Sequence, residues 1–111
     1  MQTLAERLDD ALDRAELDHG EAARVLGTNP RTVSRWIREQ AKPRPDARER
    51  VLEFLAVLDR LSLVLRAEPA HDWLFTPNPL LSHRKPVELL HDGKYREVLG
   101  AIDALGEGVF V

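Results

Sequence analysis

The 111-residue sequence predicts an all-α protein, and three observations lead to this fold class. Apolar residues recur at helical spacing along most of the chain, helix-capping patterns precede several of these stretches, and strand-like alternation is almost absent. Charged residues make up 32% of the chain and aromatic residues 5%, a composition that suits a small helical protein. The length allows one domain, or two small subdomains that share a core.

A capping pattern in the sequence predicts the start of each of the first three helices. Thr3 and Glu6 form a capping box in front of an apolar stripe, and Asp18 with Glu21 repeats the pattern. The Asn-Pro pair at 29–30 predicts the start of a third helix, because asparagine caps well and proline fits the first turn. The apolar stripe of the first helix consists of Leu4, Leu8, Ala11, Leu12 and Ala15.

The second and third helices are predicted to form a hairpin. Ala23 allows a close helix crossing, and Gly27 suits the left-handed conformation of a tight turn. Val33 and Trp36 lie three residues apart, on one face of the third helix, where they can pack onto the second. A helix presented in this way fits the major groove of DNA, although a purely structural hairpin uses the same small residue and turn glycine. The face turned outward consists of Arg31, Ser34, Arg35 and Arg38.

A long apolar helix is predicted after the hairpin. The prolines of segment 42–46 break the chain, and Asp46 with Glu49 is expected to cap a helix over about residues 46–66. Between residues 51 and 65 only four side chains are polar, and a helix that is apolar nearly all round must be buried on most sides. We therefore expect a central helix wrapped by both halves of the chain, or one that buries surface in a homodimer.

The C-terminal part is predicted to hold shorter elements. Residues 68–86 contain four prolines and predict a short helical turn followed by an ordered loop. A short helix is expected over 86–91 and ends at the next glycine, and a last helix is expected over about 94–105, stopped by Gly106 and Gly108. The apolar face of the last helix is predicted to consist of Tyr95, Val98, Leu99, Ile102 and Leu105. The sequence finishes on Val109, Phe110 and Val111.

The charges are distributed unevenly, although the net charge is only −3. Residues 1–19 carry −4, residues 20–50 carry +4 and residues 51–111 carry −3. Because screening at physiological salt acts over about 8 Å, a basic middle between acidic ends predicts one DNA-facing surface. The basic run of Arg44, Arg48 and Arg50 fits a solvated helix start and phosphate contacts equally well. The residues predicted to bind DNA are Arg31, Ser34, Arg35, Arg38, Lys42 and Arg44.

The residues do not indicate an enzyme, a metal site or a bound cofactor. Three His–Asp pairs are neighbours in the sequence, and adjacent helical residues do not face one another, so they are no evidence for a catalytic dyad. The chain has no cysteine, and no third ligand accompanies His83 and His91. An acidic N-terminus is no signal peptide, and no apolar run is long enough for a membrane, so we expect a cytoplasmic location.

Three stretches of the sequence together carry a resemblance to a known family. They are the hairpin sequence TVSRW, the segment WLFTPNPLLSHRKPVELLHDGKYREVLGAIDALGEG, and the ending GEGVFV. The chain resembles the Xre–MbcA–ParS antitoxins, and within them the MbcA type. The long segment is similar to the toxin-binding domain of that family in its tryptophan, its Pro-Asn pair, its Arg-Lys-Pro and the glycine before the last helix.

The resemblance implies a two-part antitoxin. An Xre-like helix-turn-helix module, residues 1–48, would bind the operator of its own operon. Residues 49–111, the central helix and a small helical module, would bind a RES-domain toxin that consumes NAD. From the apolar surface of residues 51–65 we also expect a homodimer, or a higher hetero-oligomer with that toxin. The residues implied in toxin binding are Trp73, Asn78, Arg84, Lys85 and Pro86, together with Val109, Phe110 and Val111.

Several alternatives stay open. Trp73 also fits a role as a core residue, and the apolar ending 109–111 could be buried in the protein's own core or in the nucleotide cleft of the toxin. Thr28 and Glu39 differ from the apolar residue and the glycine that are usual in the family, which bears on conventional operator binding. A stand-alone transcription regulator would leave the C-terminal module without a purpose. A purely structural adaptor would leave the basic segment unexplained.

Overall fold

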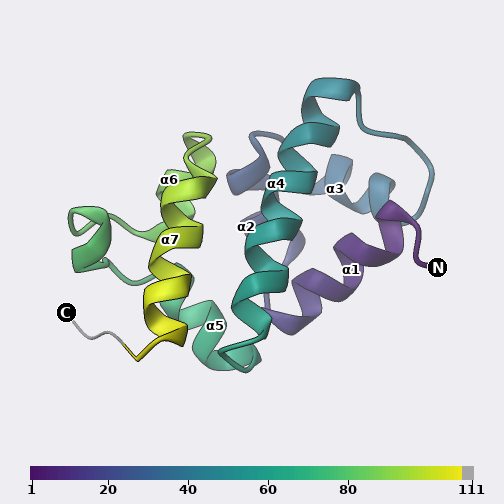
Figure 1. Ribbon diagram of the computed structural model, residues 1–111. Coiled ribbons are helices and arrows are strands. Elements are labelled where there is room, and N and C mark those ends of the chain that lie inside the picture. The colour runs from purple at the N-terminus through teal and green to yellow at the C-terminus, as the bar shows by residue number, and fades with distance from the viewer. Residues whose placement is uncertain (109–111) are drawn as a thin grey trace.

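The computed structural model describes residues 1–108, and this part of the chain is helical throughout (Figure 1). The α-helices are α1 (Leu4–Arg14), α2 (His19–Leu26), α3 (Pro30–Ile37), α4 (Pro45–Ser62), α5 (Ala67–Leu74), α6 (Pro86–His91) and α7 (Tyr95–Gly106). A 3₁₀ helix, η1, spans Pro79–Leu81, and the β-pairing within residues 1–108 is a single isolated bridge between Asn78 and Arg84. The all-α prediction is confirmed. The predicted tail, residues 109–111, lies outside the described residues.

The helix starts in the N-terminal part follow the capping signals. Thr3 Oγ1 accepts a hydrogen bond from the backbone N–H of Glu6 at 3.1 Å, and a second capping box forms at residues 18–21. Asn29 Oδ1 accepts from the N–H of Thr32 at 2.9 Å, which opens α3 as predicted. These signals act within four residues of chain, so tertiary packing does not displace them.

Helix α4 runs through the middle of the molecule and contacts α1 and α2 of the first half and α5 and α7 of the second (Figure 1). The expectation of a central helix wrapped by both halves is therefore met. Most of the apolar surface that suggested a homodimer is covered by the chain itself, but Leu63 and Val64 at its end stay exposed, so self-association stays a prediction. The core forms one continuous cluster that spans both halves. The residues that α4 buries are Val51, Phe54, Leu55, Val57, Leu58 and Leu61.

Both ends of α4 differ from the prediction. The helix begins at Pro45 with Arg44 as its N-cap, so the predicted cap of Asp46 with Glu49 is wrong. Proline at the first helical position has a φ angle already suited to the helix and needs no partner for the N–H it lacks. The helix ends at Ser62 rather than near residue 66, because the chain turns into α5 there.

The end of the last helix also differs. Gly106 lies inside α7, Glu107 is the C-cap, and Gly108 with φ of 75° follows, so Gly106 does not stop the helix. The buried face of α7 is centred on Val98, Ala101 and Ile102, because the helix packs between α4 and α6. Tyr95, Leu99 and Leu105, which were predicted on that face, are half-buried at its edges. No helix in residues 1–108 combines the length and the apolar character needed to cross a membrane.

Candidate functional site

The hairpin of α2 and α3 has the geometry that its sequence predicts. Gly27 caps α2 in the left-handed conformation, with φ of 71°. Ala23, Val33 and Trp36 are buried between the two helices and the rest of the core. The hairpin is therefore held from its inner side, and the opposite side of α3 faces outward.

The outer side of α3 collects four of the predicted DNA-binding residues in one shallow groove. Its lining consists of Arg31, Ser34, Arg35, Arg38 and Gln40. The three arginines are exposed, and the ion pairs within residues 1–108 involve other side chains. Gln40 was missed by the sequence analysis, because it lies beyond the end of α3 and is brought back by the turn that follows.

The two other predicted DNA-binding residues lie beside this groove rather than in it. Lys42 lines a separate, mainly apolar groove between α1 and the start of α4, together with Trp36 and Leu8. Arg44 is the exposed N-cap of α4. The predicted DNA-binding residues thus form one compact cluster on α3 and two outlying cations, Lys42 and Arg44.

The two positions that depart from the family pattern have different structural consequences. Glu39 has φ of 58°, the left-handed conformation that a glycine adopts without strain. Its N–H donates to the carbonyl oxygen of Trp36 at 3.1 Å, so the residue completes the turn that ends α3. Thr28 is half-buried in the turn between α2 and α3, where its N–H donates to Ala23 at 2.9 Å.

Arg50 is half-buried and bonded to backbone carbonyl groups, so it does not lie free at a helix start. Its Nη2 atom lies 3.1 Å from the carbonyl oxygen of Val25, 3.0 Å from that of Leu90 and 2.8 Å from that of His91. The C-terminal ends of α2 and α6 thus converge on one guanidinium, and each carries partial negative charge from its carbonyl groups. These contacts contradict a solvated helix start for Arg50, and its phosphate contact stays a prediction. Arg48, by contrast, is exposed.

The residues implied in toxin binding fall into two groups in the structure. Pro86 is fully buried at the first position of α6, and Trp73 is half-buried against the core. Asn78 caps η1 by accepting from the N–H of Leu80 at 2.9 Å, and its own N–H donates to the carbonyl oxygen of Arg84 at 3.0 Å. These three residues shape the C-terminal module from within.

Arg84 and Lys85 are closer to the surface. Arg84 Nη2 donates to Asp92 Oδ2 at 2.7 Å, and this hydrogen bond holds the pKa of the Asp92 carboxyl below its ordinary value of 3.8. The same bond raises the pKa of the Arg84 guanidinium. Lys85 is exposed, and its backbone N–H donates to Glu88 Oε1 at 2.9 Å.

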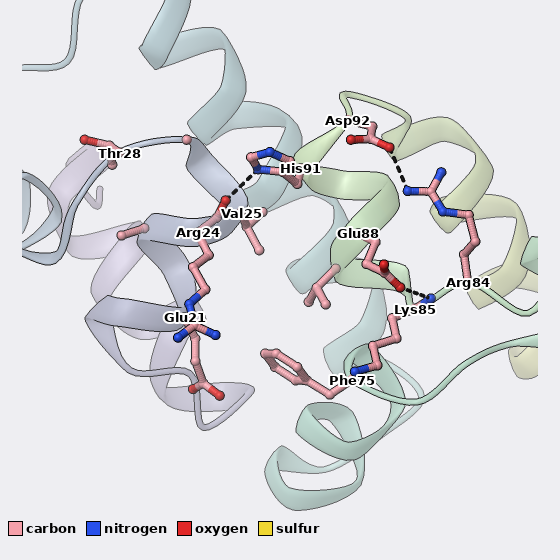
Figure 2. Close-up of a pocket in the computed structure, with 13 residues that line it drawn as sticks. Glu21, Arg24, Val25, Thr28, Phe75, Arg84, Lys85, Glu88, His91 and Asp92 are labelled. Carbon is pink, nitrogen blue, oxygen red and sulfur yellow. Dashed lines mark hydrogen bonds and ion pairs between the residues drawn. The ribbon is translucent and has the colours of Figure 1, made fainter.

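A cleft separates α2 from α6, and Arg84 and Lys85 stand on its rim (Figure 2). One wall comes from α2 and the hairpin turn, and the other from α6 and the loop before it. His91 Nδ1 donates to the carbonyl oxygen of Arg24 at 2.7 Å and joins the two walls. The cleft is lined by Glu21, Ala23, Arg24, Val25, Gly27, Thr28, Phe75, Arg84, Lys85, Val87, Glu88, His91 and Asp92.

A second polar contact ties the hairpin to the C-terminal module. His71 Nε2 on α5 lies 2.7 Å from Glu21 Oε2 on α2, and its ring stacks on Phe75 at 4.7 Å between centroids. Within residues 1–108, no three His, Cys, Asp or Glu side chains gather in an arrangement that could hold a metal ion. The histidines that the structure engages in contacts therefore join segments of the fold.

Comparison with known proteins shows that the chain is similar to one antitoxin family. Residues 60–108 match the model of the antitoxin Xre/MbcA/ParS C-terminal toxin-binding domain. The chain is 40% identical over 111 residues to the mycobacterial cidal antitoxin MbcA of Mycobacterium tuberculosis, a match that covers 100% of this chain and 98% of that protein. It is 27% identical over 107 residues to a probable mycobacterial cidal antitoxin of the same organism, covering 96% and 91%.

A solved structure agrees with the sequence relatives. The chain superposes with a TM-score of 0.89 and 40% identity on a chain from the crystal structure of the M. tuberculosis MbcT–MbcA toxin–antitoxin complex, and the match covers 100% of both chains. The similarity extends through the N-terminal hairpin as well as the C-terminal module.

Proposed function

Because this chain belongs to the Xre/MbcA/ParS antitoxin family, we propose that it binds and neutralises a cognate RES-domain toxin that consumes NAD. The observation that carries this proposal is the full-length match to MbcA, whose structural counterpart comes from a toxin–antitoxin complex. The antitoxin acts by binding, with no cofactor and no chemistry of its own. Co-expression with the product of the neighbouring gene tests the proposal directly, since the two proteins should purify together.

In this proposal, toxin binding belongs to residues 60–108 and inhibition to the apolar residues 109–111. Lys85, exposed on the rim of the cleft, would make polar contacts with the toxin, and Arg84 beside it would do so only in exchange for its bond to Asp92, whereas Trp73, Asn78 and Pro86 support the module from inside. Phe110 would enter the nucleotide cleft of the toxin, since such clefts are concave and largely apolar. Burying that side chain would contribute ~1.5–3 kcal/mol.

A truncation after Gly108 separates binding from inhibition. The shortened chain should still purify with the toxin, because the matched domain is complete, yet NAD should be consumed by the complex. The full-length chain in the same assay is the control. Full neutralisation by the shortened chain would show that inhibition comes from the folded module and not from residues 109–111.

We further propose that the arginine groove on α3 binds the operator of the antitoxin's own operon. The exposed arginines, free of ion pairs within residues 1–108, support this, as does the charge of +4 on residues 20–50. An electrophoretic shift assay with the upstream DNA, with and without the toxin, tests it. A stand-alone regulator would bind that DNA without any toxin partner, and co-purification decides between the two.

A further inference from the structure

Large apolar side chains that remain exposed are few, and they are not spread evenly. Within residues 1–108 they are Met1, Leu63, Val64 and Leu80. Apart from Met1, all lie inside the segment 60–108 that matches the toxin-binding domain. Leu63 is 81% exposed and Val64 is 40% exposed, and the two are consecutive. The first half of the molecule shows no comparable pair among its described residues.

Leu63 and Val64 stand on an ordered turn. The N–H of Leu63 donates to the carbonyl oxygen of Arg60 at 3.2 Å, and that of Val64 donates to Leu61 at 3.0 Å. The N–H of Leu65 also reaches the Leu61 carbonyl, at 2.9 Å. The backbone that presents the two apolar side chains is therefore already organised, and a partner would not have to order it on binding.

The same turn lies against the C-terminal end of α7 (Figure 1). A Cβ atom placed on Gly106 would come within 3.0 Å of Val64 Cγ1, so the two segments approach closely there. An ion pair between Arg60 on α4 and Asp103 on α7 fastens the helices one turn earlier. The apolar pair thus sits beside the point from which the chain continues towards residues 109–111.

We propose that Leu63 and Val64 form an apolar contact surface for the toxin, next to the departure point of the inhibitory residues. The inference rests on the proposed antitoxin function and deepens it, because it names a contact that neither the sequence motifs nor the cleft supplied. Exposed leucine and valine side chains contribute favourable burial free energy only when a partner covers them. Their place in the toxin-binding segment, beside the end of α7, selects the toxin over a second copy of this chain.

The test compares Leu63→Asp with Ala56→Asp in the full-length chain. Ala56 is also exposed and lies inside α4, seven residues before Leu63, so it receives the same charge away from the turn that follows the helix. The dissociation constant for the co-expressed neighbouring toxin is measured for each variant. Leu63→Asp should weaken binding at least tenfold, and Ala56→Asp should stay within about threefold of the wild type. Thermal unfolding checks that both variants fold. If Leu63→Asp does not fold, Leu63→Ser replaces it in the binding measurement.

Each other result overturns the inference. If Leu63→Asp and Leu63→Ser bind the toxin like the wild type, the surface is not part of the interface. If Ala56→Asp loses as much affinity, the effect is not specific to the turn. If the variants turn a toxin-free dimer into a monomer in light scattering and keep their toxin affinity, a second copy covers the pair. If the wild-type chain itself does not bind the toxin, the proposed function is also wrong. If the wild type and both Leu63 variants bind equally well, the proposed function stands and the contact surface alone is wrong.

Discussion

The hairpin and the C-terminal module use their arginines in opposite ways. On α3, Arg31, Arg35 and Arg38 project from an exposed groove, outside the ion pairs of residues 1–108. Around α6, Arg84 is bonded to Asp92, and Arg50 reaches across from α4 to three carbonyl oxygens. An unpaired cation can bind a phosphate, whereas a paired one holds helices together. The arginines of α3 are thus left unpaired, whereas Arg84 and Arg50 bond to other parts of the fold.

The largest expected effect tests whether the hairpin and the C-terminal module unfold independently or as one unit. Phe54 on α4 is 1% exposed and lies at the junction with Val25 of α2 and Leu90 of α6. Phe54→Ala should cost ~3–5 kcal/mol of stability, since it leaves a cavity where both regions meet the central helix. Leu63→Ala, at an exposed position, should cost far less and serves as the control.

Tryptophan fluorescence can follow the two regions separately, because Trp36 lies in the hairpin and Trp73 in α5. In single-tryptophan versions of the chain, Phe54→Ala should shift both unfolding transitions by the same amount. A shift of one transition alone would mean that the hairpin and the C-terminal module unfold independently. The predicted division at residues 48 and 49 would then also describe two cooperative units.

The next prediction concerns cohesion. Arg50→Met keeps the length of the side chain and removes the guanidinium that joins the ends of α2 and α6. We expect a loss of ~1.5–3 kcal/mol, the usual range for hydrogen bonds to a charged group. Chemical denaturation measures it. Arg48→Met is the matched control, because Arg48 is exposed two residues away, and equal effects of both changes would contradict a specific role for Arg50.

The recognition side is tested by Arg35→Ala. The variant should weaken operator binding by ~1–3 kcal/mol, as expected for an arginine that reads a base edge, and should leave stability and toxin affinity unchanged. Titration of labelled upstream DNA gives the affinity. Arg84→Ala is the counterpart from the other region and should not change DNA binding. Unchanged affinity in the double variant Arg31→Ala, Arg35→Ala would refute the assignment of the groove.

The smallest expected effect concerns the end of the hairpin. Glu39 adopts a left-handed conformation with φ of 58°, which a glycine reaches without steric cost. Glu39→Gly should therefore raise the free energy of unfolding by about 0.5–1 kcal/mol, after the greater flexibility of glycine in the unfolded chain is counted. Gln40→Gly is the control in the same turn. A loss of stability in Glu39→Gly would show that the Glu39 side chain contributes more than its backbone strain costs.

Much of the N-terminal half could be predicted from the sequence. The capping boxes at Thr3 and Asp18, the Asn-Pro start of α3 and the left-handed Gly27 all lie where their residue types indicate. Each of these signals joins residues at most four or five positions apart, so the local chain carries the whole interaction. The outward arginine face of α3 follows from the same helical periodicity, because Val33 and Trp36 select the inner face.

The uses of the C-terminal residues were decided by tertiary structure. Arg50 lies 25 residues from Val25 and 40 from Leu90, and no local pattern indicates that pairing. Pro86, which the resemblance implied in toxin binding, is a core residue, and Leu63 is exposed although the apolar pattern of residues 51–65 predicted burial. The physical reason is that burial and pairing depend on which distant segments arrive nearby. The sequence by itself determined where α1, α2 and α3 begin and which face of α3 points outward, and the packing around α4 determined which charged and apolar groups stayed exposed.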